Sequence, residues 1–301
     1  MRRGLLDRPA LPFGSASRFA RGALVLVALA GCETELDQRL AIGTEPRVLA
    51  IVATPAECAP GDAIAYTALV AGPGGAIEDP RTWAFCTSPK SPTEDNSASV
   101  GCVAGDGLIG LLGTTTASGS IPLDACQTFG PDTVAAGFRP RDPDPSGGYF
   151  QPVRLAVGDL LAIGLSRVTC DLPNAPGAVA IAYRQGYVAN VDPVLHPLAL
   201  PAVHAGDAVE LVAAWDPPET YLYYDQLAQV LVTRREAMRI SFFATAGAMD
   251  RDAVARAEDD PESSGATTWH APATPGRQTL FLVLRDSRGG IATQSRSILV
   301  E

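Results

Sequence analysis

The chain of 301 residues lacks any apolar run near the ~20 residues that a membrane-spanning helix requires, which excludes a bundle of transmembrane helices. Lysine is almost absent, because Lys90 is the single lysine among 23 basic residues, against 33 acidic ones. The net charge of −10 excludes a general electrostatic attraction to nucleic acid, and we expect no nucleic-acid partner. Hydrophobic residues nevertheless make up 47%, which supports a core and excludes global disorder.

Close pairs of metal ligands are also missing, so we predict no metal site and no cofactor. The cysteines contain no Cys-x-x-Cys pair, and the histidines contain no His-Glu-x-x-His spacing. Gly164 to Val168 lacks the second glycine of the Gly-x-Ser-x-Gly nucleophile motif, and no catalytic residue is predicted. The three histidines are His196, His204 and His270.

Two further patterns invite a functional hypothesis. Residues 105–110 fit Gly-x-Gly-x-x-Gly literally, but a dinucleotide site needs a strand before it and a helix after it, and a poor helix start follows. The acidic segment 250–262 has oxygen ligands for calcium without the spacing of an EF-hand loop, so a solvated loop is favoured. Tyr221, Tyr223 and Tyr224 are either contact residues on a loop or caps on the edge of a core.

The N-terminus carries a targeting pattern. Five arginines precede an apolar run of about ten residues, Gly22 to Gly31, which is typical of a secretory signal peptide. The run ends in Leu29-Ala30-Gly31-Cys32, which resembles the lipobox of bacterial lipoproteins. The resemblance implies that residues 1–31 are removed and that Cys32 is the lipid attachment site. The alternative is an ordinary cleaved signal with a cysteine there by chance.

The lipobox also implies a location. Acylation of Cys32 would attach the chain to a lipid bilayer, and polar residues 32–46 would form a tether. Glu33 stands where an aspartate would favour retention in the inner membrane, so the resemblance favours the outer membrane of the cell envelope.

Export places the remaining cysteines in an oxidising compartment, where disulfides form. Five cysteines follow Cys32, and an odd number leaves at least one thiol unpaired within the chain. A bond between Cys86 and Cys102 would close a polar loop, and Cys126 with Cys170 is the second candidate pair. Cys58 is then the odd one, although the sequence does not fix this connectivity.

The rest of the chain predicts many short strands and an all-β fold, because 29 glycines and 25 prolines break helices. Residues 87–150 form an irregular insertion with short strands, one of them at about 107–112, and residues 190–193 form a joint between domains at about 47–193 and 194–301. Short helices are predicted near 225–232 and 250–258. The predicted strands are 47–54, 63–71, 81–86, 151–156, 160–170, 178–187, 195–200, 209–215, 239–244, 278–285 and 291–300.

The C-terminal half resembles the Ig-like and PKD-like modules of bacterial surface proteins. The resemblance rests on Gly206-Asp207-Ala208-Val209 at the start of a strand, on Trp215, and on the closing hairpin around residues 286–290. Gly61-Asp62-Ala63-Ile64 repeats the first of these motifs in the N-terminal half. The resemblance implies two immunoglobulin-like β-sandwiches, the first with the long irregular insertion.

Together these patterns predict a non-catalytic lipoprotein of the cell envelope that serves as a binding or structural module. We expect an envelope protein or a glycan as its partner. One alternative is an accessory subunit of an envelope export or assembly complex, which predicts an exposed apolar patch. Another is an envelope hydrolase with a site in residues 87–150, which predicts a cleft that gathers serine or aspartate with His204 or His270.

Overall fold

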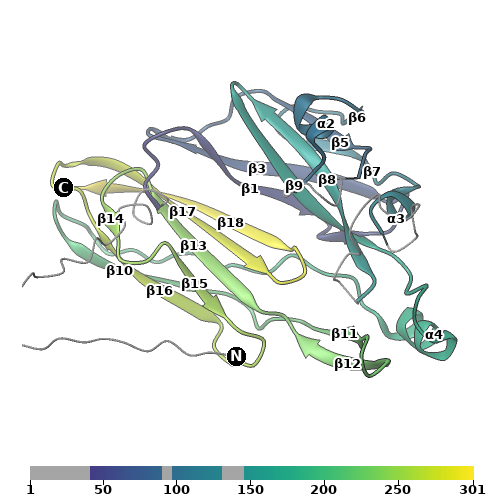
Figure 1. The fold of residues 1–301 in the computed structure, drawn as a ribbon. Coiled ribbons are helices and arrows are strands. Elements are labelled where there is room, and N and C mark those ends of the chain that lie inside the picture. Colours follow the sequence, from purple (N-terminus) through teal and green to yellow (C-terminus); the bar gives the residue numbers. More distant parts are fainter. Residues whose placement is uncertain (1–40, 90–96, 131–145) are drawn as a thin grey trace, which may run out of the picture. The chain divides into compact units, whose positions relative to one another are not determined.

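Strands dominate the residues that the computed structural model describes, which are 41–89, 97–130 and 146–301 (Figure 1). The predicted signal peptide and Cys32 lie outside these residues. All of these described residues belong to one compact unit. Within the described ranges, no helix is long and apolar enough to cross a membrane.

The first β-sandwich is built from two sheets that enclose Tyr66, Trp83, Phe85 and Leu155. Trp83 and Phe85 share one face of their strand, as the alternation predicts. One sheet holds β1 (Arg47–Thr54), β3 (Ala63–Gly72), β4 (Gly75–Ala76) and β7 (Ala117–Ser120), with β3 between the others. The other sheet has the order β2 (Glu57–Cys58), β9 (Leu160–Thr169), β8 (Gly148–Val157), β5 (Arg81–Cys86) and β6 (Leu108–Gly110).

The second sandwich encloses Leu211, Ile240, Phe242, Trp269 and Leu282. One of its sheets has the order β10 (Ala208–Ala214), β16 (Ser264–His270) and β14 (Ala248–Met249). The other sheet has the order β15 (Ala253–Arg256), β13 (Met238–Ala244), β17 (Gly276–Asp286) and β18 (Ile291–Val300).

Both sandwiches share the strand order of an immunoglobulin fold. In the first sandwich, β3 pairs with β7 in one sheet, and β5, β8 and β9 pair in succession in the other. The second sandwich repeats this scheme: β10 pairs with β16 in one sheet, and β13, β17 and β18 pair in succession in the other. This is the B–E and C–F–G pairing of immunoglobulin-like domains. The chain is therefore all-β with two immunoglobulin-like sandwiches.

The repeated Gly-Asp motif is the same turn in both sandwiches. Gly61 and Gly206 have φ of 90° and 82°, a left-handed conformation that glycine adopts without steric cost. The Asp62 and Asp207 carboxylates accept the backbone N–H three residues before them, at 2.9 and 2.7 Å. The turn then opens β3 and β10, so the four-residue match in the sequence reflects a structural repeat.

β17 is buried on both faces and joins the two sandwiches. Leu280, Leu282 and Leu284 point into the core of the second sandwich. Phe281 and Val283, on the opposite face, pack with Leu49 and other residues of β1 and β3. The uninterrupted apolar run of β17 is thus explained by two cores rather than one.

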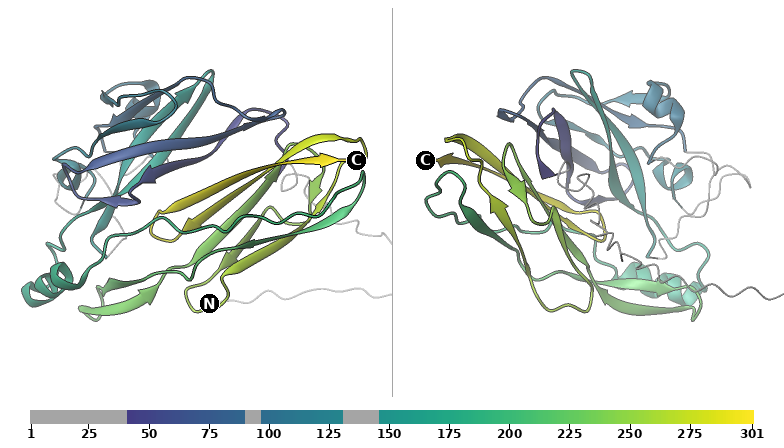
Figure 2. Two further views of the ribbon diagram at one scale, coloured as in Figure 1. Left: turned by 180° about the vertical axis from the view of Figure 1, so that it is seen from behind. Right: turned by 60° about the vertical axis from the view of Figure 1, so that its left-hand side comes forward.

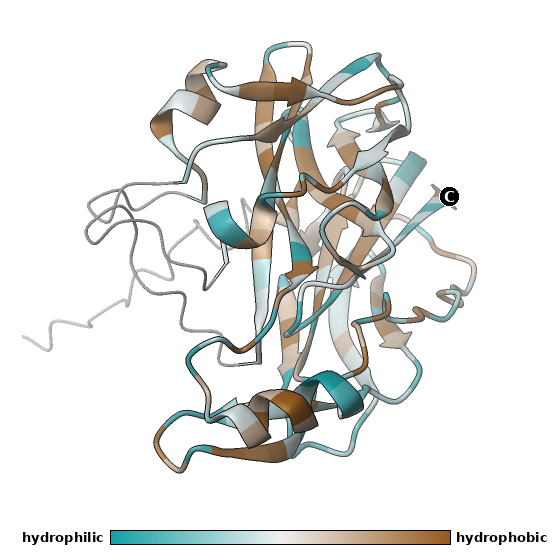
Figure 3. Ribbon diagram, turned by 90° about the vertical axis from the view of Figure 1, so that its right-hand side faces the viewer, coloured by the Kyte–Doolittle hydropathy of each residue, from teal (hydrophilic) through white to brown (hydrophobic). Residues whose placement is uncertain are grey.

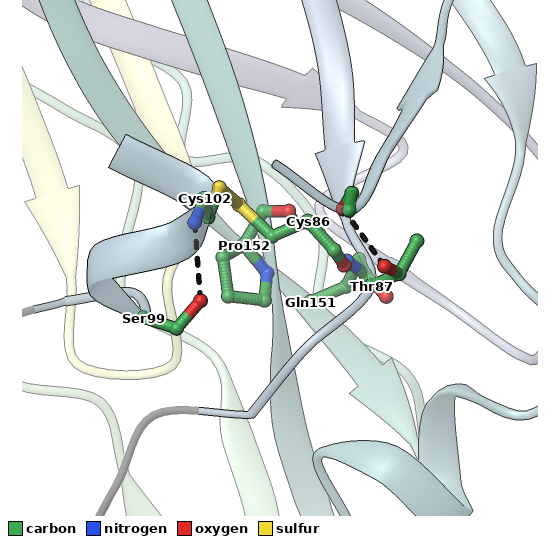
Figure 4. Close-up of a disulfide and its surroundings, with 7 residues drawn as sticks. Cys86, Thr87, Ser99, Cys102, Gln151 and Pro152 are labelled. Atoms are coloured by element: carbon green, nitrogen blue, oxygen red, sulfur yellow. Dashed lines mark hydrogen bonds between the residues drawn. A yellow bond between two sulfur atoms is a disulfide. The ribbon is translucent and has the colours of Figure 1, made fainter. Parts of the chain in front are cut away.

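Two disulfides hold the first sandwich, and they are the two pairs that the sequence favours. Cys86 at the end of β5 is bonded to Cys102 in α2 (Val100–Ala104), and Cys126 in α3 (Ala125–Thr128) is bonded to Cys170. Figure 4 shows the first pair, with Ser99 accepting the Cys102 N–H at 3.2 Å as the cap of α2. Cys58 is a buried free thiol, and burial raises its pKa to about 11.

Several predicted elements are wrong. Residues 178–187, predicted as a strand, instead form α4 (Gly177–Gly186). The segment is rich in alanine, which has the highest helix propensity. Ala180 and Tyr183 lie about one turn apart on the buried face of this helix. The helix predicted near 225–232 is instead a hairpin of β11 (Thr220–Asp225) and β12 (Val230–Arg235). The segment 250–258, predicted as a helix, instead contains the strand β15. Residues 195–200 make only an isolated bridge at Leu195, since Pro197 lacks the N–H that a ladder needs.

The described part of the segment 87–150 contains the helices α2 and α3 and the strands β6 and β7, so the predicted insertion also builds the sandwich, and β6 lies within the short strand predicted at 107–112. β6 extends one sheet of the first sandwich and β7 completes the other. Residues 105–107 follow helix α2 and precede strand β6, which is the reverse of the strand–turn–helix order of a dinucleotide site.

The end of the predicted tether also packs against the body. Ala41 is buried in the core of the second sandwich, and Ile42 forms a parallel bridge with Ala244 at the end of β13. Arg47 then donates a hydrogen bond to the Ile42 carbonyl at 2.6 Å and lies over the Phe243 ring. The chain therefore contacts the second sandwich before it enters the first.

Phe281→Ala tests whether the shared face of β17 couples the sandwiches. Removing this ring leaves a cavity between β17 and β1, and we expect a loss of about 3–5 kcal/mol in the free energy of unfolding. We also expect one calorimetric unfolding transition to become two. Leu299→Ala, at an exposed position of β18, serves as the control and should stay within about 0.5 kcal/mol of the parent. A single unshifted transition in Phe281→Ala would contradict the coupling.

Candidate functional site

A small lobe, built from the segment between the sandwiches and from a hairpin of the second one, is the first candidate site. We call residues 171–188, which include α4, and residues 220–235, which form the β11–β12 hairpin, the hairpin–helix lobe. In Figures 1 and 2, α4 lies beside this hairpin. A core of its own, in which Leu172, Ala180, Tyr183 and Tyr224 are buried, holds the lobe together.

The three tyrosines predicted as contacts have unequal roles. Tyr224 is buried in the core of the lobe, which is the capping alternative of the prediction. Tyr221 is half-buried with the Arg288 guanidinium 4.7 Å from its ring centre, and Tyr223 stacks with Arg234 at 3.7 Å. Only Tyr221 and Tyr223 therefore keep part of their surface for a partner.

Large apolar side chains of the lobe are exposed. Leu227, in the turn between β11 and β12, is 99% exposed, and Val188 and Ile181 are 63% and 54% exposed. The Asp225 carboxylate accepts the N–H groups of Leu227 and Ala228 at 2.9 and 3.0 Å, which fixes the backbone of this turn. Figure 3 shows apolar residues along α4 and the strand below it. The exposed Leu227, Val188 and Ile181 are apolar residues of the kind from which a contact surface is built.

A shallow hollow of about 660 Å³ lies beside α4. Its walls include the Cys126–Cys170 disulfide, Leu172 and Arg184, and an Arg184–Asp171 ion pair at 3.2 Å spans two of its lining residues. The hollow has the size of a small-ligand site but few converging polar groups.

Next to the lobe lies a buried cluster of charges, which we call the junction. Its centre is Glu57 of β2, whose side chain is fully buried. Arg167 of β9 and Arg288 of the β17–β18 turn each place a guanidinium nitrogen 3.1 Å from the Glu57 carboxylate. The Tyr187 hydroxyl, the Thr169 hydroxyl and the Asn190 N–H donate to the same carboxylate at 2.8–3.0 Å.

Arg288 connects the junction to the lobe. Its Nη2 donates to the Tyr187 hydroxyl at 2.7 Å and to the Val188 carbonyl at 2.8 Å. Its Nη1 lies 3.4 Å from the Glu236 carboxylate and 3.8 Å from Glu219. One buried guanidinium thereby contacts β2, the linker after α4, and both ends of the hairpin segment.

The segment predicted as a joint between domains, residues 190–193, is held by hydrogen bonds at several points. Asn190 is buried, and its side chain donates to the Asp286 carboxylate at 3.2–3.3 Å. The Val191 N–H donates to Glu219 at 3.2 Å, and the Asp192 carboxylate accepts the Ile291 N–H at 3.0 Å. The linker is therefore pinned to the second sandwich.

Burial changes the acidity of this region. It raises the pKa of Glu236 to about 8, and the charges of Asp286 and Glu219 raise it while Arg288 lowers it. Burial also raises the pKa of Asp192 to about 6 and raises the pKa of Asp286 and of Tyr187. A pKa of about 8 keeps the Glu236 carboxyl mostly protonated at neutral pH.

The other residues singled out by sequence lie apart from the lobe and the junction. Each histidine pairs with an aspartate, His196 with Asp216, His204 with Asp207 and His270 with Asp250, and all three side chains are about half-exposed or more. The hollow beside Asp250 is lined by Thr267 and Thr268 but by no serine or histidine, and the Thr267 hydroxyl donates to the Arg251 carbonyl.

The acidic segment 250–262 does not gather its carboxylates. Asp260 pairs with Arg256 at 3.2 Å, and Glu262 pairs with the same guanidinium. Among the described residues, no group of three or more His, Cys, Asp or Glu side chains is placed to hold a metal ion. The structure thus gives no support to calcium binding by this segment.

Sequence reasoning missed Glu57, Arg167, Arg288 and Glu236. Glu57 and Arg288 are separated by 231 positions, so no local spacing connects them. The only signal was in the turn 286–290, which was recognised as a turn and not as the source of a buried cation.

Comparison with known proteins adds little. No protein-family model matches the chain, and no curated protein matches it. Among solved structures, the chain is similar to the Yersinia pseudotuberculosis adhesin InvE, with 12% identity and a TM-score of 0.23 over 84% of this chain and 58% of that one. It is also similar to invasin, a bacterial integrin-binding protein, with 10% identity and a TM-score of 0.21 over 85% and 39% of the chains.

A third similar structure is Escherichia coli alpha-2-macroglobulin, with 10% identity and a TM-score of 0.22. The match covers 87% of this chain and 14% of that one. The chain therefore spans little more than half of InvE and smaller shares of the other two proteins. The fold assignment rests on the strand pairing described above.

A double-mutant cycle of Glu57→Gln and Arg288→Met tests the junction. Arg288→Met leaves a buried carboxylate with one cation fewer, and we expect a loss of about 3–5 kcal/mol in the free energy of unfolding. The double variant should lose less than the sum of the two single variants, because the second change removes the charge that the first leaves unpaired. Urea unfolding of the four proteins measures the coupling, and additive losses would contradict it.

Proposed function

We propose that the chain is a non-catalytic lipoprotein of the cell envelope, anchored through Cys32, whose hairpin–helix lobe makes the contact with a partner. The two sandwiches act as a rigid support, and the junction fixes the lobe on it. The lipobox-like residues 29–32 support the anchor and favour the outer membrane.

The observation that carries this proposal is the exposure of Leu227, Val188 and Ile181 on a lobe that has its own core. A side chain as large as leucine at 99% exposure gains nothing for folding, since it stays in water in the folded chain. It gains free energy only when a partner covers it. Half-buried Tyr221 and Tyr223 offer aromatic surface of low conformational entropy beside it.

The partner class is an envelope protein or a glycan. Arg234, whose guanidinium lies over the Tyr223 ring, presents a cation and an aromatic side chain together, a combination that serves protein and sugar surfaces alike. The function requires no cofactor.

Leu227→Asp tests the contact. Wild-type protein fixed to beads should retain a specific partner from an envelope extract at moderate salt, and Leu227→Asp should reduce the retained amount by tenfold or more, the loss expected for a central apolar contact of about 1.4 kcal/mol. Leu112→Asp, at a similarly exposed leucine of the first sandwich, should retain it fully. Equal retention by Leu227→Asp would reject the lobe as the contact surface.

Cys32→Ala tests the anchor. Cells grown with a radiolabelled fatty acid should yield labelled wild-type protein in the membrane fraction, since the thiol of Cys32 is the acceptor of the lipid. The Cys32→Ala protein should carry no label, whereas Cys58→Ala should be labelled as strongly as wild type because Cys58 is buried in the first sandwich. Labelled Cys32→Ala protein would overturn the anchor.

A further inference from the structure

We propose that the junction is a proton-operated latch, in which a proton on the Glu236 carboxyl keeps the linker 187–191 closed on the β17–β18 turn and loss of that proton releases it. This role concerns the conformation of the chain, and it does not depend on the proposed contact function.

The first support is the count of charges around Arg288. Among the described residues, the carboxylates of Glu57, Glu219 and Glu236 all approach this one guanidinium, at 3.1, 3.8 and 3.4 Å. The second cation of the junction, Arg167, forms its ion pair with Glu57. Arg288 therefore cannot neutralise Glu219 and Glu236 together, and the surplus negative charge sits beside them.

The second support is the difference in burial between those two carboxylates. The side chain of Glu219 is 38% exposed, so water solvates its charge, whereas that of Glu236 is 3% exposed. Of these two carboxyls, Glu236 is therefore the one whose ionisation costs more free energy. Its raised pKa of about 8, caused first by burial and then by the charge of Asp286, agrees with this geometry.

Each element around Glu236 contributes a named group. The β17–β18 turn places Arg288 and Asp286 near it, and the residue before β11 places Glu219 near it. Glu57 of β2 and Tyr187 of the linker bind the same Arg288, and Arg167 of β9 pairs with Glu57. An added negative charge at Glu236 is therefore opposed by two acidic groups and attracted by one cation that is already shared.

The third support is the path from Glu236 to the linker. The Glu236 carboxylate accepts the Glu219 N–H at 3.2 Å, and the Glu219 carboxylate accepts the Val191 N–H at 3.2 Å. Repulsion between the two carboxylates acts directly on this hydrogen bond. The next amide, Asn190, is held by Glu57 and opens with the same segment.

The sign of the pH dependence follows from linkage. The pKa of Glu236 is raised in the closed form, so the closed form holds the proton more tightly than an open form with the ordinary value of 4.5. The equilibrium constant for opening should then rise by up to about tenfold per pH unit between pH 5 and 8, and level off above pH 8.

Hydrogen exchange in the full chain tests the latch. We would measure protection factors, which remove the intrinsic pH dependence of exchange, for the Asn190 and Val191 amides from pH 6 to 9. We expect their protection to fall at least tenfold between pH 6 and 8, whereas amides of β13 and β17 keep theirs. Protection at Asn190 and Val191 that does not change with pH would overturn the proposal.

Glu236→Gln is the matched variant, because the amide has the shape of the carboxyl and cannot lose a proton. Its Asn190 and Val191 protection should be independent of pH over the same range. Glu262→Gln, at an exposed carboxylate outside the junction, should retain the wild-type dependence. A wild-type pH dependence that persists in Glu236→Gln would assign the proton to another group and reject the latch.

Discussion

The fully buried carboxylate of Glu57 is the constraint around which the junction is arranged. A carboxylate taken from water is tolerated only where cations and hydrogen-bond donors surround it. Here two guanidiniums, two hydroxyls and one backbone N–H come from β9, the linker and the turn of the second sandwich. Because these donors lie on segments far apart in the chain, satisfying one acidic group requires both sandwiches and the linker to be in place.

Two kinds of contact hold the sandwiches and the lobe together, the apolar packing of β17 on β1 and the ionic contacts of Arg288. Phe281 and Val283 of β17 supply buried area against β1, which is non-directional and favours association of the two sandwiches. Arg288 supplies direction, because a guanidinium donates in a fixed planar geometry. Its stacking with Tyr187 and Tyr221 then sets the orientation of the lobe. Buried ionic groups add little net stability in many proteins, and specifying orientation is the role this geometry suits.

The sequence predicted what depends on local pattern and missed what depends on partners. Strands such as 47–54 and 63–71 are predicted by β-branched residues that lie between turn signals. The strands β17 and β18 are predicted by the glycine-rich turn that joins them. The disulfide between Cys86 and Cys102 followed from the loop it closes. In contrast, α4 is a short apolar run whose periodicity is ambiguous, and the lobe core that selects a helix is completed by Leu222 and Tyr224, over 30 positions later. The junction carried no signal, since an isolated glutamate and an arginine in a turn look like ordinary surface residues.

The packing of residues 41–43 on β13 decides where mechanical tension enters the fold. A pull along the chain from the N-terminal side reaches the bridge between Ile42 and Ala244 before it reaches β1. Arg47, bonded to Ile42 and lying over Phe243, passes the load to the second sandwich at the same point where β1 begins. Force is thus shared between both sandwiches at their seam, and the first strand is shielded from being peeled away on its own.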